Sequence, residues 1–213
     1  MMSSRLYPAV KRLLDVVVAL LLLGPTLVTI ALAAAAALVI QGRPVLFTQP
    51  RVGRHGRPFL LMKLRTMVGP PASGRAYREG HRLTGYGRLV RHLRLDELPQ
   101  VVNLLTGTMS LVGPRPLVID HVVDADGGGR RHEVRPGFTC YAQLELVEHG
   151  YLDRYRQVSL DEEYVDRMSL RTDVAILWRT ALVLVGPRRP RPSLARFEPD
   201  RAGAAAVRPD AGP

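Results

Sequence analysis

The chain has one cysteine and two lysines among its 213 residues, and each scarcity excludes something. Because Cys140 has no second cysteine, an internal disulfide and a zinc site built from clustered cysteines are both excluded, which fits a reduced, cytosolic environment. Because lysine occurs only at positions 11 and 63, arginine carries most of the positive charge, a bias that can record genomic base composition. The length allows one sizeable domain, or a modest domain plus a membrane segment, and disfavours a two-domain enzyme.

Acidic residues are scarce in the N-terminal half. Residues 1–95 contain 15 arginines or lysines but only two acidic residues, Asp15 and Glu79, whereas residues 96–213 contain 15 basic and 17 acidic residues. The formal net charge of +11 therefore belongs to the N-terminal half, beside the longest apolar run of the chain. This distribution makes an anionic membrane surface and a phosphorylated substrate partners as natural as a nucleic acid.

Charge is absent from residues 16–40, a run of 25 residues. A helix of this length, at about 1.5 Å per residue, reaches across a hydrocarbon core of about 30 Å. Pro25 lacks an amide proton and clashes with the carbonyl group of Leu21, so we expect a bend there. Basic residues flank the run on both sides, which favours a re-entrant, monotopic anchor over residues 1–42 with both ends in the cytoplasm. A bent single span and a cleaved signal peptide are the alternatives.

Beyond the anchor, the pattern predicts a domain of the α/β class, mostly helical, over residues 43–186. Two short strands are expected at residues 44–48 and 58–64, joined by a basic turn. Helices are expected at residues 86–95, 98–105, 117–125, 151–168 and 169–185. Residues 187–213 are rich in proline, arginine, alanine and aspartate, and we expect them to form a disordered tail.

The helix at residues 98–105 has the clearest pattern, because its apolar side chains recur at intervals of three and four residues. The members of this stripe, all expected in the core, are Leu98, Val101, Val102 and Leu105. Asp96 is expected to be the N-cap, and Gly107 is expected to end the helix. Gln100 and Asn103 are expected to have structural roles.

Two adjacent carboxylates, Asp96 and Glu97, stand at the start of this helix among basic residues. At a helix N-terminus both side chains can border one pocket, and the helix dipole attracts phosphate oxygens. Carboxylate and phosphate oxygens bind Mg²⁺ together, while arginine forks bind the remaining phosphate charge. The pattern therefore indicates a site for a magnesium-bound diphosphate, and a solvated helix cap with surface arginines is the alternative. The neighbouring basic residues are Lys63, Arg65, Arg91, Arg94 and Arg115.

The sequence around the acidic pair is long enough to be a specific motif. It reads LDELPQVVNLLTGTMSLVGPRPL from residue 95, and KRLLD, FTQPRVG, KLRTM and VRPGFT accompany it elsewhere in the chain. Over residues 8–185, and in the same order, these motifs closely resemble the bacterial sugar transferase family, the monotopic polyprenyl-phosphate phosphoglycosyl transferases. The resemblance implies an N-terminal re-entrant membrane helix followed by a small membrane-associated catalytic domain.

The resemblance implies transfer of a sugar 1-phosphate from a UDP-sugar to polyprenyl phosphate, with release of UMP. It places this first membrane step of a surface glycan pathway at the cytoplasmic face of the bacterial inner membrane. Asp96 matches the nucleophile of the family, which forms a covalent intermediate, and is also expected to bind the cofactor Mg²⁺. Glu97 matches the second acid of the pair, and either activation of Asp96 or metal positioning suits it. The expected partners are the UDP-sugar, polyprenyl phosphate and membrane lipid, and a homo-oligomer is left open.

Four basic residues near the motifs are expected to bind substrate. Arg91 and Arg115 match basic positions of the family and are expected to clamp phosphate groups, with Lys63 and Arg65 as supports. For each of them, a surface ion pair is the competing interpretation.

The chain departs from the family at residues 140–147, where the usual Asn-Gly-Arg is absent and Glu145 is the only charge. If this segment borders the sugar, Tyr141 and Glu145 contribute to donor selection. A carboxylate accepts hydrogen bonds and repels anions, so neutral sugars would then be favoured over acidic ones. A repacked loop away from the substrate is the alternative.

Two other function classes fit part of the pattern. A catalytically silent membrane scaffold for glycan assembly would keep the fold, but it has little reason to retain both acids and the basic loop. A nucleic-acid binder is consistent with the net charge alone, and it predicts strongly salt-dependent DNA binding that persists without the anchor. The resemblance favours the enzyme, and we expect no nucleic-acid partner.

Overall fold

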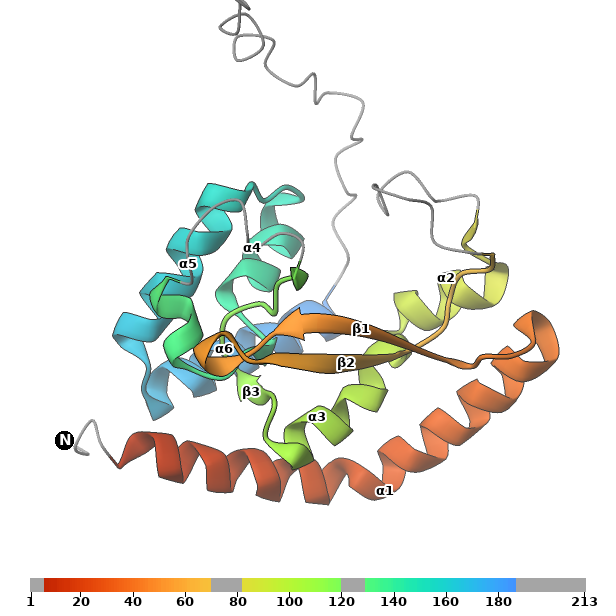
Figure 1. The fold of residues 1–213 in the computed structure, drawn as a ribbon, viewed down its shortest axis with the longest axis horizontal. Helices are drawn as coiled ribbons and strands as arrows, with labels where there is room; N and C mark the ends of the chain where they lie inside the picture. Colours follow the sequence, from red (N-terminus) through yellow and green to blue (C-terminus); the bar gives the residue numbers. More distant parts are fainter. Residues whose placement is uncertain (1–5, 70–81, 120–128, 187–213) are drawn as a thin grey trace, which may run out of the picture.

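The computed structural model describes residues 6–69, 82–119 and 129–186, and most of them lie in helices (Figure 1). In chain order the elements are α1 (Tyr7–Gln41), β1 (Leu46–Val52), η1 (Arg54–Gly56), β2 (Pro58–Leu64), α2 (Gly85–His92), η4 (Leu95–Gln100), α3 (Val101–Thr106), β3 (Ser110–Val112), η6 (Arg130–Glu133), β4 (Gly137–Thr139), α4 (Tyr141–His149), α5 (Arg154–Arg167) and α6 (Leu170–Val185). The mostly helical class with small sheets is confirmed. The tail expected at residues 187–213, and most of the helix expected at 117–125, lie outside the described residues.

Two small sheets position the loops of the domain. β1 and β2 form an antiparallel hairpin, whereas β3 and β4 are parallel. The second predicted strand is confirmed, but the first begins at Leu46 and continues to Val52, past the expected end at residue 48. Pro50 is tolerated within this strand because, among the described residues, β2 is the only strand that pairs with β1 in the sheet, and the backbone on its other side is bridged only at Arg51 and Val52.

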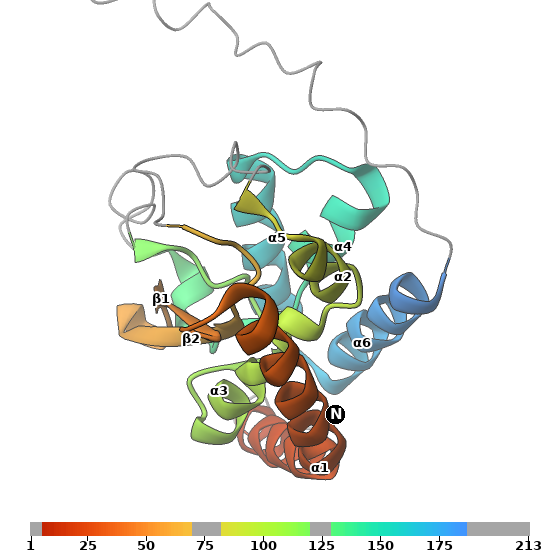
Figure 2. The same ribbon diagram turned by 90° about the vertical axis from the view of Figure 1, so that its right-hand side faces the viewer.

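The N-terminal helix α1 is continuous over 35 residues, and Pro25 lies close to its middle. Figure 1 shows the expected bend in this helix, and Figure 2 shows α3 and α6 on either side of it. It is long and apolar enough to cross a membrane. Its buried residues recur mostly at intervals of four and are Tyr7, Lys11, Asp15, Ala19, Ala33 and Ala37.

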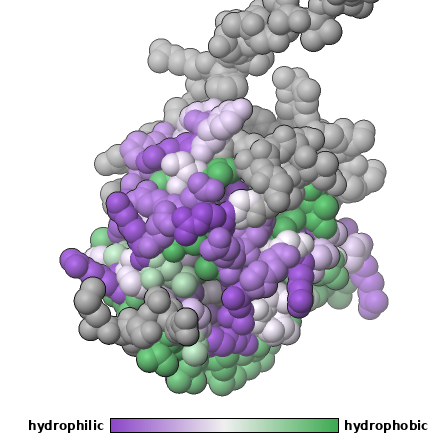
Figure 3. Space-filling model, turned by 60° about the vertical axis from the view of Figure 1, so that its left-hand side comes forward, coloured by the Kyte–Doolittle hydropathy of each residue, from purple (hydrophilic) through white to green (hydrophobic). Residues whose placement is uncertain are grey.

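The rest of the α1 surface is apolar and exposed. Its exposed large side chains include Leu13, Leu20, Leu21, Leu27, Val28, Leu32 and Val39. Figure 3 shows hydrophobic surface gathered along the lower edge of the molecule, where α1 runs, while the surface above it is hydrophilic. This division is typical of a protein that places one edge in lipid.

Both ends of α1 are bound to the domain by polar contacts. At the N-terminal end, Lys11 forms an ion pair with Asp173 of α6, which also accepts hydrogen bonds from Tyr7 (2.6 Å) and Tyr164 (2.8 Å). At the C-terminal end, Gln41 donates to the hydroxyl group of Thr84 at 2.5 Å.

Four apolar clusters lie among the described residues, and two of them are larger than the others. One joins α1, β2 and α3 through Ala19, Phe59, Leu61, Val101, Leu104 and Met109. The other joins β3 and the last three helices through Val112, Leu144, Tyr164 and Ile176. Val102 was expected in the core but is 42% exposed, because the α-helix begins only at Val101 and turns Leu104 inward instead.

The segment at residues 141–149 forms helix α4, which the sequence pattern does not predict. Cys140 caps it, since its sulfur accepts the backbone N–H of Gln143 at 3.3 Å, and Gly150 ends it in the left-handed conformation. The later helices agree with expectation: α5 begins after Asp153 and α6 begins after the N-cap Ser169.

Candidate active site

Asp96 and Glu97 lie on η4, a six-residue 3₁₀ helix between α2 and α3. The prediction that Asp96 is an N-cap is wrong. The cap position is occupied by Arg94, which has a left-handed backbone (φ 59°) and no capping side chain, because the chain reverses there on leaving α2. Both acids therefore lie in the first turn of η4. Gly107 ends α3 as expected.

Strand β2 holds Glu97 in place. The Lys63 ammonium group donates to Glu97 Oε1 at 3.0 Å, and the Arg94 guanidinium lies 4.0 Å from Oε2. Asp96 is only 8% exposed, and within the described part of the chain no other side chain donates a hydrogen bond to it. Glu97 is thus paired with a cation, whereas no side chain among the described residues hydrogen-bonds the carboxylate of Asp96.

The surroundings shift the two acids in opposite directions. Burial raises the pKa of Asp96, and the charge of Glu97 raises it further, while Lys63 and Arg91 act against this rise. Burial would also raise the pKa of Glu97, but the charge and hydrogen bond of Lys63, with Arg94 and Arg115, lower it overall. Two adjacent carboxylates with separated pKa values are a feature of catalytic pairs.

Arg91 reaches the acidic pair from α2. Its Nε donates to the buried hydroxyl group of Thr66 at 2.7 Å, and its charge lowers the pKa of Asp96. A Cβ atom at Gly87 would lie 2.0 Å from the carbonyl oxygen of Thr66, so α2 can approach the end of β2 this closely only because residue 87 is glycine.

Arg115 lies on the loop that follows β3, and its charge lowers the pKa of Glu97. Its side chain is partly buried, and within the described residues the guanidinium donates no hydrogen bond. Lys63 on β2 thus contacts the acidic pair directly, and the charges of Arg91 on α2 and of Arg115 on the loop after β3 act on it as well.

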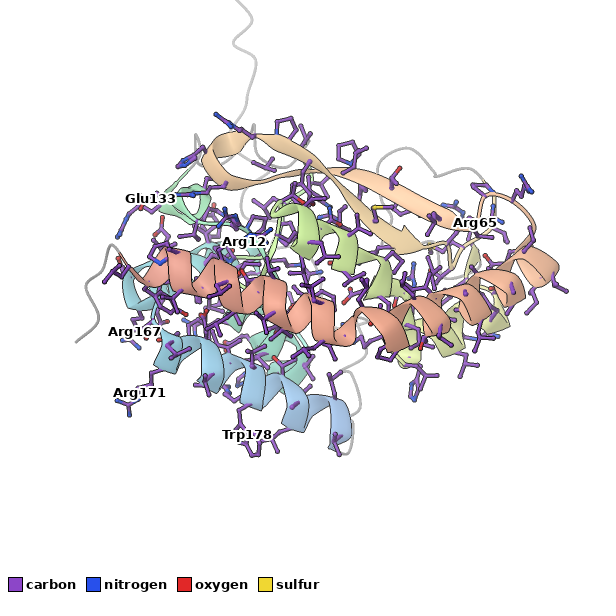
Figure 4. The ribbon with its side chains drawn as sticks, turned by 90° about the horizontal axis from the view of Figure 1, so that it is seen from below. Arg12, Arg65, Glu133, Arg167, Arg171 and Trp178 are labelled. Atoms are coloured by element: carbon purple, nitrogen blue, oxygen red, sulfur yellow. The ribbon has the colours of Figure 1, made fainter. Side chains whose placement is uncertain are left out.

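Arg65 does not join this group. Its guanidinium donates to the carbonyl oxygens of Gln41 (2.5 Å), Gly42 (2.7 Å) and Arg43 (3.2 Å) at the end of α1 (Figure 4). Two of its nitrogen atoms thus bind main-chain oxygens at the C-terminal end of α1 and in the two residues that follow. These contacts join anchor and domain, and a role for Arg65 in phosphate binding stays a prediction.

Tyr141 and Glu145 lie on α4, and no described contact joins them to η4. The Tyr141 ring packs edge-on against Tyr164 with centroids 6.4 Å apart, and Glu145 pairs with Arg156 at 3.2 Å. These partners belong to α5. A role for either residue in donor selection stays a prediction.

Several residues with polar contacts near the site had no predicted role. Thr66 lies within the KLRTM motif and Arg51 within FTQPRVG, so their motifs marked them without indicating a role. Arg131 and Asp161 carried no such signal, because charged residues in polar segments are usually solvated. Gln100 and Asn103 are buried as expected, and Asn103 donates to the carbonyl oxygen of Leu60 on β2 at 2.9 Å.

The acidic pair could supply the protein ligands of a magnesium site. Within the described residues there is no cluster of three or more His, Cys, Asp or Glu side chains. Mg²⁺ does not need one, because it is commonly bound by one or two carboxylates together with substrate phosphates and water. Asp96 and Glu97 fit that donor set.

Comparison with known proteins agrees with the motif. Residues 6–187 match the family described as bacterial sugar transferase. The chain is 43% identical over 172 residues to the uncharacterized sugar transferase EpsL of Bacillus subtilis, covering 80% of this chain and 84% of that protein. It is 40% identical over 182 residues to a UDP-glucose:undecaprenyl-phosphate glucose-1-phosphate transferase of Caulobacter vibrioides, covering 80% and 67% of the two chains.

Some relatives are much longer. A UDP-glucose:undecaprenyl-phosphate glucose-1-phosphate transferase of Escherichia coli is 37% identical over 183 residues, which cover 80% of this chain but 39% of that protein. The residues matched by the family include the acidic pair and the basic residues around it. The chain therefore belongs to the bacterial sugar transferase family.

Proposed function

We propose that the protein transfers a sugar 1-phosphate from a UDP-sugar to polyprenyl phosphate, releasing UMP and forming a polyprenyl-diphosphate sugar. The observation that carries this proposal is the buried carboxyl group of Asp96, which no side chain among the described residues hydrogen-bonds, beside Glu97. The charge of Arg91 acts on Asp96, and the charge of Arg115 acts on Glu97. The names of the relatives from Caulobacter vibrioides and Escherichia coli support the general reaction.

In the first step, an Asp96 oxygen attacks the phosphorus atom that bears the sugar. A bond forms between this oxygen and phosphorus, and the bond from phosphorus to the bridging oxygen breaks, so UMP leaves with the electron pair. Only the ionised carboxylate can attack. Lys63 and Arg91 favour this form, since their charges oppose the effect of burial on the pKa of Asp96.

In the second step, an oxygen of the lipid phosphate attacks the same phosphorus atom and displaces Asp96. This oxygen needs no general base, because a phosphate monoester already carries about 1.5 to 2 negative charges near neutral pH. Glu97 is accordingly proposed to be an electrostatic and positioning group rather than a base, in keeping with its lowered pKa and its bond to Lys63. The two steps let a soluble donor and a membrane-bound acceptor react without being aligned together.

Charge on the phosphates is proposed to be balanced from two sides. Arg91 and Arg115 can each bind phosphate oxygens in a forked arrangement. Asp96 would hold Mg²⁺, with Glu97 beside it, and the bound ion would neutralise the charge that develops on the diphosphate.

We further propose that α1 is a re-entrant anchor at the cytoplasmic face of the membrane. Both of its ends are bound to the same domain, at Asp173 and at Thr84, which suits a helix that enters the lipid and returns. Helix α6 adds exposed apolar residues, among them Trp178, which points away from α1 (Figure 4). A thiol introduced by Ser4→Cys tests the topology, because the natural Cys140 is buried and the new thiol reports alone. Labelling from outside intact cells would establish a span instead.

The reaction is tested by UMP release from the purified full-length protein in lipid nanodiscs with a panel of UDP-sugars and polyprenyl phosphate. We expect magnesium-dependent release with at least one donor, and none from Asp96→Asn at an unchanged melting temperature. A folded wild-type protein that releases no UMP with any donor would favour the catalytically silent scaffold.

A further inference from the structure

The loop that carries Arg115 has most of its backbone hydrogen-bonded. Gly113 donates to Thr139 (3.2 Å), Pro114 accepts from Gly137 (2.9 Å), Pro116 accepts from the guanidinium of Arg51 (2.9 Å), and Leu117 accepts from Val52 (3.0 Å). The two prolines have a fixed φ and no N–H to satisfy. A Cβ atom at Gly137 would lie 2.1 Å from the nitrogen of Gly113, so the loop rests directly on the backbone of β4.

A buried ion pair forms hydrogen bonds with both backbone polar groups of Arg115. Arg131 of η6 and Asp161 of α5 lie 2.7 Å apart, and their side chains are 2% and 1% exposed. Asp161 Oδ1 accepts the backbone N–H of Arg115 at 3.2 Å, and Arg131 donates to the carbonyl oxygen of Arg115 at 2.7 Å. The three residues form a closed ring, in which each one contacts the other two.

Stability alone does not explain such a pair. A buried ion pair is often no more stable than well-packed apolar residues of the same size, since two charges must be removed from water. Burial raises the pKa of Asp161 to about 6, although Arg131 and Arg115 act in the opposite direction. The charge of Asp161 is therefore kept at a cost. Besides a side-chain hydrogen bond with Gln157, its polar contacts are with Arg131 and with the backbone N–H of Arg115.

The residue held in this way has an uncommitted side chain. The backbone of Arg115 is fixed on both sides, whereas its guanidinium donates no hydrogen bond within the described residues and its field reaches Glu97. We propose that Arg131 and Asp161 are positioning residues, which hold Arg115 so that its guanidinium meets the donor phosphates. This inference rests on the proposed transfer reaction and assigns a role to two residues outside the acidic pair.

The test is a double-mutant cycle on the full-length protein in nanodiscs. The charge-neutral variant Arg131→Gln/Asp161→Asn leaves no unpaired buried charge. We expect its KM for the UDP-sugar to rise about tenfold or more, because a small misplacement of a substrate-binding group costs up to about a hundredfold. In an Arg115→Ala background the same two substitutions should add less than about twofold, because the group that they position is already gone.

Two control variants separate positioning from folding. Arg130→Gln/Asp166→Asn removes a neighbouring pair on the same two elements, whose side chains are 54% and 55% exposed, and it should leave KM unchanged. Leu160→Ala removes buried packing beside Asp161 and should lower the melting temperature without raising KM. If the charge-neutral variant does not fold, Arg131→Lys is the alternative. Lysine keeps the charge but cannot bind Asp161 and the carbonyl oxygen of Arg115 in a forked arrangement. This variant should raise KM at a melting temperature near that of the wild type.

Different results would overturn the positioning role and the proposed transfer reaction. An unchanged KM in a folded variant, or losses that multiply in the Arg115→Ala background, would overturn the positioning role. A wild-type protein without UMP release would overturn the proposed reaction instead. In that case the readout is the rise in melting temperature that UDP binding causes. This rise should be lost equally in Arg115→Ala and in the charge-neutral variant. Stabilisation that only Arg115→Ala removes would overturn the inference independently of turnover.

Discussion

The contact between α1 and α6 gives a prediction whose size follows from burial. Asp173 accepts hydrogen bonds from Tyr7 and Tyr164 and pairs with Lys11, and the side chains of the ion pair are 11% and 8% exposed. Replacing it by asparagine leaves a buried ammonium group without its counter-charge. Removing one partner of a buried pair costs about 3–5 kcal/mol, and about 1 kcal/mol shifts the melting temperature of a domain of this size by about 2–4 °C. We therefore expect Asp173→Asn to melt about 6–20 °C below the wild type.

The assay is thermal unfolding of the full-length protein in nanodiscs. Adding Lys11→Met to Asp173→Asn should recover most of the lost stability, because the unpaired charge is then removed. Breaking the solvent-accessible pair between Arg179, which is also on α6, and Glu148 of α4, 2.7 Å apart, should change the free energy of unfolding by less than about 1 kcal/mol. A wild-type melting temperature for Asp173→Asn, or a double variant as unstable as the sum of the single ones, would refute the argument that this pair holds α1 to the domain.

Three further predictions concern the site. UMP release should fall as the pH is lowered through the raised pKa of Asp96. Glu97→Gln should move this acid limb of the pH–rate profile to lower pH, since the charge of Glu97 raises the pKa of Asp96. An acid limb that does not move in this variant would contradict the coupling between the two acids. Arg65→Ala should lower the melting temperature but leave the donor KM unchanged, whereas a phosphate ligand would raise it. Gly87→Ala places a Cβ atom 2.0 Å from the carbonyl oxygen of Thr66. It should lower the free energy of unfolding by about 1–3 kcal/mol and reduce kcat/KM. A variant with wild-type stability and activity would show that α2 can shift freely.

Local patterns predicted much of the fold, because the features concerned depend on neighbours in sequence. The long uncharged run gave α1, Pro25 gave its bend, and the apolar periodicity after Ser169 gave α6. The acidic pair and three of its basic neighbours could likewise be assembled from their motifs.

Other features depend on contacts between distant segments, and the sequence could not reveal them. Arg94 takes the cap position because the chain must reverse between α2 and η4, and nothing in its local sequence indicates a left-handed residue. Arg65 binds the end of α1, which lies more than twenty residues earlier in the chain. The pairing of Arg131 with Asp161 exists only once η6 packs on α5, so each residue looks like an ordinary surface charge beforehand.

In the proposed mechanism Asp96 becomes covalently bonded to the phosphosugar. The most direct measurement is intact mass and peptide mapping after the wild-type protein has been mixed with its UDP-sugar and Mg²⁺ in the absence of polyprenyl phosphate. We expect about one equivalent of UMP, a mass increase of one sugar phosphate on the peptide that contains Asp96, and loss of this mass when polyprenyl phosphate is added. Asp96→Asn should show neither the UMP nor the added mass. UMP release that requires both substrates together, or a label on a different residue, would contradict the account.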